Sequence, residues 1–451
     1  MKKEDNMKLT PSLIACAVLC LSPSTQAQTA KEVAAEMRLM REELRHLRAE
    51  LDAIKKQKNT EFITPAKPVT YELAHGNLQD SQKGAGLQTT HSSRPEVESA
   101  ANAVNMFGYG ELSLVRPKNN RADTVATARR GVLGFGYRFN ERTRFAAELE
   151  IENAVVSAGD QGEAAFEQLY VEHDIDDGLS AKMGLFLLPI GYMNETHEPT
   201  RYFGVTRNLV ETAIIPTTWR EMGLGLRGTR DSGWRWDAGV VTSFDLNKWP
   251  TNSADSQASP LGAIHQEGQL AKAASLAYYG ALNFDGIPGV NFGGSLFQGG
   301  IGQKQNTIAS PNASVTLAEI HTKWQVGAWD LSALVAQGHF HDVSAFNAST
   351  KGIANPVPDQ FRGWYAQAAY RLWRKGDYSL VPFARYERVN TALGYSGVFA
   401  GQVYDNAPES KVITAGVSYY LHPQVVLKMD MQKYQNNSAL DRLNMGVGFH
   451  Y

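Results

Sequence analysis

The sequence is poor in cysteine: its 451 residues include only Cys16 and Cys20, both near the start. The rest of the chain therefore has no thiol, which excludes disulfides, cysteine-ligated metals and cysteine nucleophiles there. The sequence also lacks an excess of either charge. Its 44 basic and 46 acidic side chains leave a formal net charge of −2, so the balance does not indicate a nucleic-acid partner. No stretch after the start has the length and apolarity of a transmembrane helix.

The start of the chain has the pattern of a secretory signal peptide over residues 1–27. Lysines at positions 2, 3 and 8 precede a short apolar run at 13–21, and small residues at 25 and 27 form a cleavage site. Residues 13–16 also resemble a lipoprotein processing box, which is the alternative interpretation of this segment. Export of a cysteine-free mature chain suits an oxidising compartment such as the periplasm.

A heptad repeat follows at 31–57 and predicts a parallel, self-associating coiled coil, with domain limits 28–58, on the periplasmic side of the membrane. Glutamates at the g positions precede basic residues at the next e positions, which favours in-register parallel helices. The alternative is a single amphipathic helix packed on the body of the protein. Residues 59–104 have no sustained periodicity and are interpreted as a linker. The apolar heptad positions are Val33, Met37, Met40, Leu44, Leu47, Leu51 and Ile54.

From about residue 105 to 451 the sequence becomes a series of short segments with alternating polar and apolar side chains. A period of two places alternate residues on opposite faces of a strand, so such segments have one wet and one apolar face. In the segment 143–153, the outward set is predicted to be Phe145, Ala147, Leu149 and Ile151, and the inward set Arg144, Glu148, Glu150 and Glu152.

The connections between these segments alternate between short turns and long loops, which is typical of an outer-membrane barrel. Seven turns and eight loops join sixteen strands. The predicted fold is therefore an all-β transmembrane barrel of about 16 antiparallel strands, preceded by the N-terminal α-helical coiled coil. The short turns fall at 140–143, 174–178, 229–233, 285–289, 327–329, 374–377 and 422–424. The loops fall near 117–127, 156–163, 190–221, 245–271, 303–314, 341–360, 390–409 and 435–441.

The last strand alternates apolar residues up to the terminal Tyr451. This ending resembles the signal that outer-membrane insertion machinery reads, so we expect the barrel-assembly machinery to bind here. The other expected partners are outer-membrane lipid and lipopolysaccharide, two further copies of the chain in a homotrimer, and small anionic or neutral solutes.

Four runs of residues resemble the phosphate-selective porin O/P family: GLFLLPIG at 184–191, MNETHEP at 193–199, TRNLVETAII at 206–215 and PTTWREMGLG at 216–225. The resemblance covers roughly residues 105–451 and is strongest across 130–245. It implies a trimeric sixteen-stranded porin whose third extracellular loop, here 190–221, folds into the pore as a constriction. In that family, arginines line the lumen as a ladder and lysines in the constriction hold the anion. The segment 190–221 departs from that pattern because it contains no lysine.

Pores discriminate by width and by the charges that line them, so basic side chains are the candidates for solute binding. One interpretation is that they form a strip that favours anions. The alternative is that they pair with acidic neighbours and leave a weakly selective channel. The acidic neighbours are Glu148, Glu150, Glu152, Asp237, Glu387 and Asp430 on the strands and Glu195, Glu198, Glu211 and Glu221 in the predicted loop. The candidate pore-lining residues are Arg138, Arg144, Lys182, Arg201, Arg207, Arg220, Arg227 and Arg385.

We expect a porin for passive diffusion of small hydrophilic solutes, with anions such as phosphate or carboxylates as the specific hypothesis, and no catalytic residue, metal or cofactor. The alternatives are a non-selective general porin, a barrel enzyme or an envelope tether. No Gly-x-Ser-x-Gly elbow or compact Ser/His/Asp grouping supports an enzyme. His197 between Glu195 and Glu198 is interpreted as a structural hydrogen-bonding residue, since one histidine with two nearby carboxylates in sequence is a weak metal signal.

Overall fold

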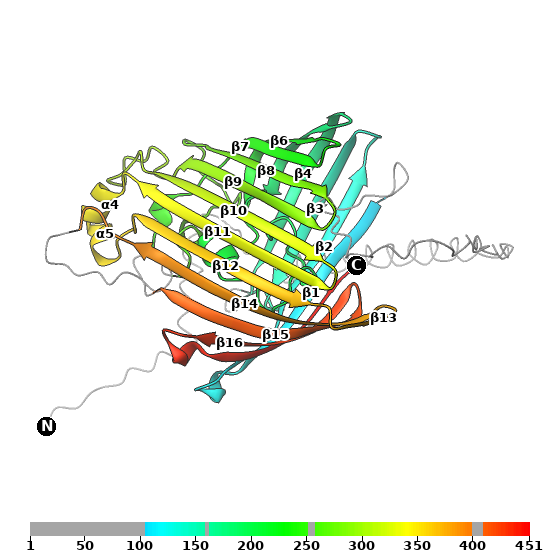
Figure 1. The fold of residues 1–451 in the computed structure, drawn as a ribbon. Helices are drawn as coiled ribbons and strands as arrows, with labels where there is room; N and C mark the ends of the chain where they lie inside the picture. The colour runs from blue at the N-terminus through cyan, green and yellow to red at the C-terminus, as the bar shows by residue number, and fades with distance from the viewer. Residues whose placement is uncertain (1–103, 158–161, 251–257, 399–408) are drawn as a thin grey trace, which may run out of the picture. The chain divides into compact units, whose positions relative to one another are not determined.

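The computed structural model describes residues 104–157, 162–250, 258–398 and 409–451. In these ranges the chain forms one antiparallel sheet with short helices in its loops (Figure 1). The strands are β1 Val104–Pro117, β2 Val125–Arg138, β3 Thr143–Glu152, β4 Ala164–Asp176, β5 Leu179–Leu187, β6 Arg220–Thr229, β7 Trp234–Val241, β8 Ala277–Ile287, β9 Val290–Gly300, β10 Ser314–Val326, β11 Trp329–His341, β12 Gln360–Tyr370, β13 Trp373–Lys375, β14 Tyr378–Leu393, β15 Ser410–His422, β16 Val425–Tyr434 and β17 Arg442–His450. The helical turns are η2 Arg121–Asp123, η3 Val210–Ile214, η4 Leu246–Lys248, η5 Gly262–Ile264, α4 Ser344–Ala348, α5 Thr350–Ala354 and η6 Ser438–Leu440.

The sheet closes into a barrel because β1 pairs with both β2 and β17. The closing register runs from Tyr109 opposite His450 to Pro117 opposite Arg442. β12 and β13 both pair with β14 and form one passage of the barrel wall, interrupted only at residues 371–372. The prediction of sixteen antiparallel strands is therefore confirmed. Closure leaves no strand edge without a partner, which is the condition for a sheet in lipid.

The two faces of the wall differ as the alternation predicts. On β3, Arg144, Glu148 and Glu150 are buried inside the barrel, whereas Ile151 is exposed on the outside. The outward face of the other strands also carries large exposed apolar side chains. They include Leu133, Met183, Leu224, Leu296, Ile320, Val335, Leu427 and Met445. The barrel thus has an apolar exterior and a charged interior.

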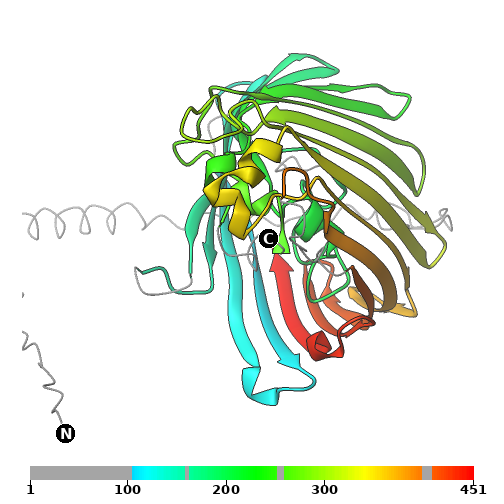
Figure 2. The ribbon, with the colours of Figure 1, turned by 90° about the vertical axis from the view of Figure 1, so that its left-hand side faces the viewer.

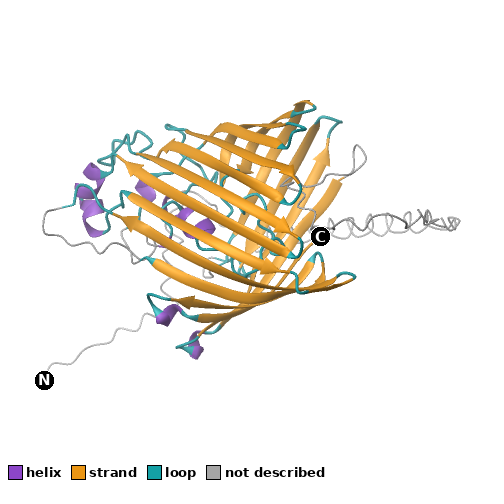
Figure 3. Cartoon of the chain, viewed as in Figure 1, coloured by secondary structure: helices purple, strands orange, loops and turns teal. Residues whose placement is uncertain are grey.

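The two ends of the barrel also differ. All seven predicted short turns join strands at one end, and the eight longer connections lie at the other, where Figure 3 shows α4 and α5. Aromatic side chains gather at the short-turn end: Trp234 packs on Phe284 and Phe292, and Trp329 packs on Tyr370. Such aromatics are typical of the water–lipid boundary of a membrane barrel. No helix in the described ranges is long and apolar enough to cross a membrane.

Long loops pack an apolar cluster inside the long-loop end, on the side of β5–β12. Phe186 and Phe297 from the wall contact a core that includes Trp219, Phe244 and Ile214, all almost fully buried. One side of the lumen at this end is therefore filled by side chains. The polar interior lies elsewhere along the wall, and the candidate site lies there.

Several predicted boundaries shift by a few residues. The third loop covers 188–219 rather than 190–221, so Arg220 is the first residue of β6 and not a loop residue. The seventh strand was predicted to run to 244 but ends at Val241; the Ser243 carbonyl accepts a hydrogen bond from Gln266 Nε2 of the following loop. The predicted signal peptide at 1–27, the coiled coil at 28–58 and the linker at 59–104, except for Val104 at the start of β1, lie outside the described residues.

Candidate functional site: the loop inside the barrel

The loop 188–219 lies inside the barrel and contacts its wall along most of its length. Green loop segments lie within the ring of strands in Figure 2. Its first residues continue from the apolar end of β5, where Leu188 and Ile190 are fully buried. Asn194 holds this start against the loop's return, since its side-chain nitrogen donates to the carbonyls of Leu188 and Trp219 at 2.7 and 2.8 Å. The two ends of the loop are therefore fastened together.

From there the loop descends through the lumen to the short-turn end. The hydroxyl of Thr200 lies 2.6 Å from Nδ1 of His450, and its carbonyl accepts a hydrogen bond from the Tyr420 hydroxyl at 3.2 Å. His450 and Tyr420 stand near the ends of β17 and β15, where the short turns begin. The loop thus crosses nearly the full height of the barrel.

The loop then climbs back along β15 and β16, bonded residue by residue to inward positions of the wall. A backbone held at successive positions cannot move as a free flap, because each step satisfies a polar group that would otherwise be buried unpaired. The contacts are Ser418 Oγ donating to the Phe203 carbonyl (2.7 Å), Lys428 Nζ to the Gly204 carbonyl (2.9 Å), the Val205 amide to Asp430 Oδ2 (2.6 Å) and Gln432 Nε2 to Thr206 Oγ1 (2.9 Å).

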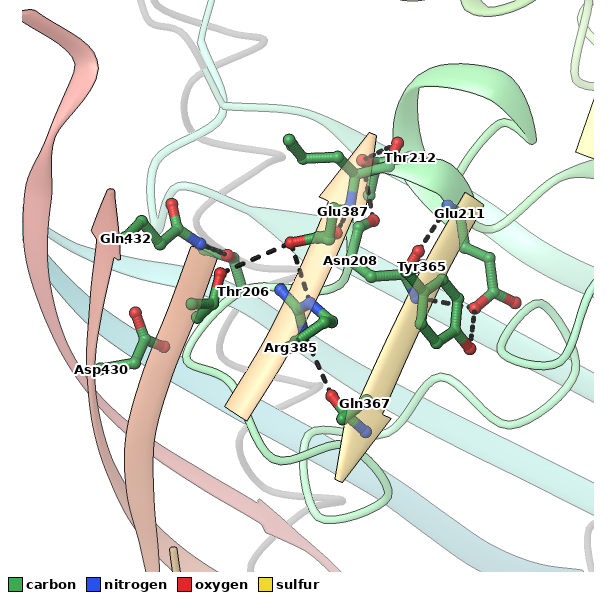
Figure 4. Close-up of polar contacts among 12 residues, drawn as sticks. Thr206, Asn208, Glu211, Thr212, Tyr365, Gln367, Arg385, Glu387, Asp430 and Gln432 are labelled. Atoms are coloured by element: carbon green, nitrogen blue, oxygen red, sulfur yellow. Dashed lines mark hydrogen bonds and ion pairs between the residues drawn. The ribbon is translucent and has the colours of Figure 1, made fainter. Parts of the chain in front are cut away.

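Glu211, in η3, fixes the upper part of the loop. Its carboxylate accepts the backbone amides of Tyr192 and Met193, both at 2.6 Å, together with Asn208 Nδ2 at 2.7 Å and the Tyr365 hydroxyl at 3.2 Å. Burial raises the pKa of Glu211 above its ordinary value, against the effect of these donors. Figure 4 shows Glu211 and Tyr365 side by side. One carboxylate thereby joins both halves of the loop to β12.

Arg385 is the predicted cation that faces this part of the loop. Its Nε lies 2.9 Å from Glu387 Oε2 and its Nη1 donates to Gln367 at 3.4 Å (Figure 4). Its Nη2 is buried without a hydrogen-bond partner in the part of the chain that the structure describes. Glu387 in turn accepts the Leu209 amide of the loop at 2.6 Å. Arg385 is therefore compensated in charge, although one of its buried donors has no partner among the described residues.

Glu195 forms ion pairs with three basic side chains of the opposite wall. It lies 2.6 Å from Arg227, 3.9 Å from Lys182 and 3.7 Å from Arg235. Burial alone would raise the pKa of Glu195, but these cations lower it to about 2. Arg227 and Arg235 also pair with Asp237, at 2.5 and 3.4 Å. Two carboxylates thus face three cations here.

The other predicted residues are also mostly paired. Arg144 lies 2.7 Å from both Glu172 and Asp174, which makes it part of the wall rather than of the loop contacts. Arg220 lies 3.2 Å from Glu267, a residue of the loop after β7. The more exposed Arg201 is 3.9 Å from Glu198, and Arg138 donates to the Glu141 carbonyl at the short-turn rim. The structure therefore does not bring the eight candidates together in one strip.

Arg207 is the exception among the loop arginines. It donates to the hydroxyls of Thr217 and Thr218 and, at 3.4 Å, to the His197 carbonyl. Within the described residues it is ion-paired to no carboxylate, although it is buried. It is therefore the loop arginine of the predicted set that forms no ion pair within the described residues.

A small polar recess separates the first part of the loop from β7–β10. It measures about 30 Å³, which is room for about one water molecule. Sequence reasoning did not name any of its wall residues. Asn283, Asn291 and His321 were missed because only basic side chains were taken as candidates, and Arg235 was missed although it is basic. Its lining is Pro189, Gly191, Tyr192, Glu195, Thr196, Arg235, Asn283, Asn291 and His321.

Comparison with known proteins supports a family and a fold. A protein of Aquifex aeolicus, described as "Uncharacterized protein", is 31% identical over 339 residues, which cover 72% of this chain and 74% of that protein. No protein-family model matches the chain. The structure of Salmonella typhi OmpF in complex with daunomycin is similar with a TM-score of 0.52 and 12% identity, covering 78% of this chain and 98% of OmpF.

Two further solved structures resemble the chain at lower similarity. One is an anion-selective porin from Comamonas acidovorans, with a TM-score of 0.47 and 13% identity over 78% of this chain and 99% of that one. The other is the outer membrane channel DcaP of Acinetobacter baumannii, with a TM-score of 0.48 and 10% identity over 78% and 98%.

Proposed function

We propose that this chain, which belongs to the same family as the Aquifex aeolicus protein, is an outer-membrane porin through which small hydrophilic solutes diffuse passively. The observation that supports this most strongly is the difference between the two faces of the closed barrel. An apolar exterior suits lipid, whereas a charged interior suits water and ions. Sixteen-stranded barrels are wide enough for an aqueous channel, and the loop 188–219 narrows it.

The orientation follows from the two ends of the barrel. Long loops are extracellular and short turns periplasmic in outer-membrane barrels. β1 begins and β17 ends at the short-turn end, where Tyr109 and His450 are opposite each other. We propose that the start of β1 and the end of β17 face the periplasm, and that the protein is a homotrimer in the outer membrane.

The pairing of the lumen charges favours weak selectivity over a strong preference for anions. Four acidic side chains each form an ion pair with a predicted pore-lining cation: Glu195, Asp237, Glu267 and Glu387. A paired cation attracts a passing anion less, because the field of its carboxylate partner opposes its own. Selectivity for phosphate or carboxylates, which the resemblance to the phosphate-selective porins implies, would depend on Arg207 and on the free donor of Arg385.

Swelling of liposomes that contain the purified protein tests the proposal. We expect the liposomes to swell rapidly in small neutral sugars. The rate of swelling should fall steeply as the size of the sugar increases, as for a water-filled pore narrowed by a loop. Liposomes with heat-denatured protein serve as the control. Swelling no faster than in that control, for every sugar and for succinate, would contradict passive diffusion.

A further inference from the structure

Three side chains meet inside the barrel where the loop passes β3 and β4. His197 comes from the loop, Glu148 from β3 and Glu167 from β4. One donor atom of each lies within 4.8 Å of the other two, and all three side chains are more than nine-tenths buried. We propose that this cluster is a binding site for a divalent first-row transition metal ion such as Zn²⁺.

A break in the strand pairing brings the second carboxylate into the site. Glu148 is opposite Gln168 and Leu149 is opposite Phe166, so Glu167 is an extra residue in β4. This β-bulge turns both Glu167 and Gln168 inward, whereas strict alternation would place only one of them inside. Bulges of this kind re-aim side chains next to functional sites. The bulge therefore puts a second carboxylate beside Glu148.

The histidine presents a free nitrogen to the two carboxylates. Its Nδ1 lies 3.0 Å from the Asn194 carbonyl, which can only accept, so Nδ1 carries a hydrogen and donates. Its Nε2 has no hydrogen-bond partner in the described part of the chain and lies 3.6 Å from Glu167 Oε2. Metal-bound histidines typically donate their other ring nitrogen to a carbonyl in this way. Glu148 Oε2 is likewise buried without a hydrogen-bond partner among the described residues.

The surroundings hold the donors in place and leave negative charge to be balanced. The Tyr109 hydroxyl donates to Glu167 at 3.1 Å, and its ring stands edge-on to the His197 ring, with centroids 5.4 Å apart. Arg130 of the wall is engaged by Glu111 at 3.2 Å and Glu150 at 3.7 Å. Arg207 of the loop, which donates to the His197 carbonyl, supplies one positive charge nearby. The two buried carboxylates therefore still carry more negative charge than this one cation offsets, and a divalent cation would balance it.

The donor set selects the class of metal. One imidazole nitrogen with two carboxylate oxygens suits Zn²⁺, Mn²⁺ or Fe²⁺, whereas Ca²⁺ and Mg²⁺ prefer oxygen alone. Zn²⁺ bonds of about 2.0–2.2 Å place tetrahedral ligand atoms roughly 3.4 Å apart, so modest rotations of the two glutamate side chains would complete the site, with water as the fourth ligand. A bound ion would fasten the descending part of the loop to two strands of the wall.

Zinc binding to the full-length protein in detergent tests the proposal, with ZnCl2 as the titrant in calorimetry. The variants are His197→Asn and Glu148→Gln. His321→Asn is the matched control, because His321 is also a buried lumen histidine beside a glutamate, with Nδ1 2.9 Å from Glu319 and Nε2 3.0 Å from Asn283. Loss of a ligand should lower zinc affinity by more than the roughly 10- to 100-fold effect of removing a group that only supports one.

A zinc site that is present in the wild type and the control but lost in both variants supports the proposal. Equal zinc affinity in all four proteins would overturn it. The absence of zinc binding in the wild type would also overturn it, and would leave His197 as an ion-pair partner of Glu167 only. Anomalous diffraction from zinc-soaked wild-type crystals is a second test, and it does not require the variants to fold. A peak between His197, Glu148 and Glu167 is expected, and zinc peaks only at other positions would contradict the assignment.

Discussion

Glu195 shows how a single side chain can set the charge of the lumen. It faces Lys182, Arg227 and Arg235, and no other loop carboxylate in the described residues contacts as many cations of the wall. It also lines the recess beside the loop, so its charge contributes to the field on this side of the lumen. Neutralising it leaves the three cations with Asp237 alone.

We therefore expect Glu195→Gln to raise the preference for anions. A unit charge about 4 Å away changes the energy of an ion in water by about 1 kcal/mol, in opposite directions for chloride and potassium, so the chloride-to-potassium permeability ratio should rise by up to about 30-fold. Reversal potentials in a planar bilayer measure this ratio. Glu141→Gln, at the exposed rim of the barrel, should leave it unchanged. An unaltered ratio in Glu195→Gln would show that solutes do not pass this side of the loop.

The Arg220–Glu267 pair predicts a dependence of selectivity on pH. Burial alone would raise the pKa of Glu267, but His265 and Arg220 hold it below its ordinary value of 4.5. A lowered pKa means that the pair is fully present above pH 4.5 and is lost as the pH falls through the lowered value. Acidification therefore leaves Arg220 without its counter-charge.

Comparison of the wild type with Glu267→Gln isolates this pair from the other carboxylates of the lumen. At pH 7 the variant should prefer chloride more than the wild type does, because Arg220 is already uncompensated. As the pH falls well below 4.5 the two proteins should converge. Bilayer reversal potentials between pH 7 and pH 3 measure the difference, and a constant difference across that range would refute the pairing.

At the scale of single residues, the sequence predicted which side chains face inward but not which groups they contact. A period of two is enough to place Arg144, Arg227 and Arg385 inside the barrel, and all three lie there. Arg144 and Arg385 pair with residues of neighbouring strands, which depends on a strand register that alternation does not give. Arg227 also pairs with Glu195 of the loop 188–219, which has no periodicity that could show its fold. Glu167 escaped prediction for another reason, since a bulge breaks the alternation from which facing is deduced.

At the scale of elements, hydrogen bonds to individual wall strands, such as β15 and β16, hold the loop 188–219 in the lumen. The Val205 amide donates to Asp430, whose other oxygen accepts Asn444 Nδ2 at 2.7 Å. This contact lies midway along the climb beside β16. A hydrogen bond to a charged group contributes about 1.5–3 kcal/mol, so its loss should loosen this stretch of the loop.

Asp430→Ala is expected to widen or destabilise the constriction. Single-channel recordings should show a larger mean conductance and more current noise than the wild type. Asp330→Ala is the matched control, because this wall carboxylate pairs with Lys323 and Gln325 on neighbouring wall positions instead of with the loop. Identical recordings for Asp430→Ala and the wild type would mean that the other loop contacts are sufficient.

The elements themselves were well predicted, because turn residues and alternation are local signals. All seven short turns and the positions of the eight loops are confirmed. The apolar cluster at the long-loop end was not foreseen, since Trp219, Phe244 and Phe346 come from three different loops. Only the folded barrel brings these loops together.

At the scale of the whole molecule, the predicted coiled coil at 28–58 lies outside the described residues and remains a prediction about assembly. Deleting residues 28–60 should leave the conductance of the barrel nearly unchanged, because the wall and the loop lie entirely after residue 103. The trimer should dissociate at a lower temperature, because the paired heptads are lost. Gel mobility after stepwise heating measures this, and a truncated trimer as heat-resistant as the full chain would remove that role.

The central claim is that the barrel is a passive pore whose lumen charges largely cancel. The reversal potential of the wild-type protein under a KCl gradient in a planar bilayer, repeated with phosphate and succinate salts, tests it most directly. We predict open channels with a weak ionic preference. A strong anion preference with block by phosphate or succinate would contradict the cancellation of charges, and the absence of any channel would contradict the pore itself.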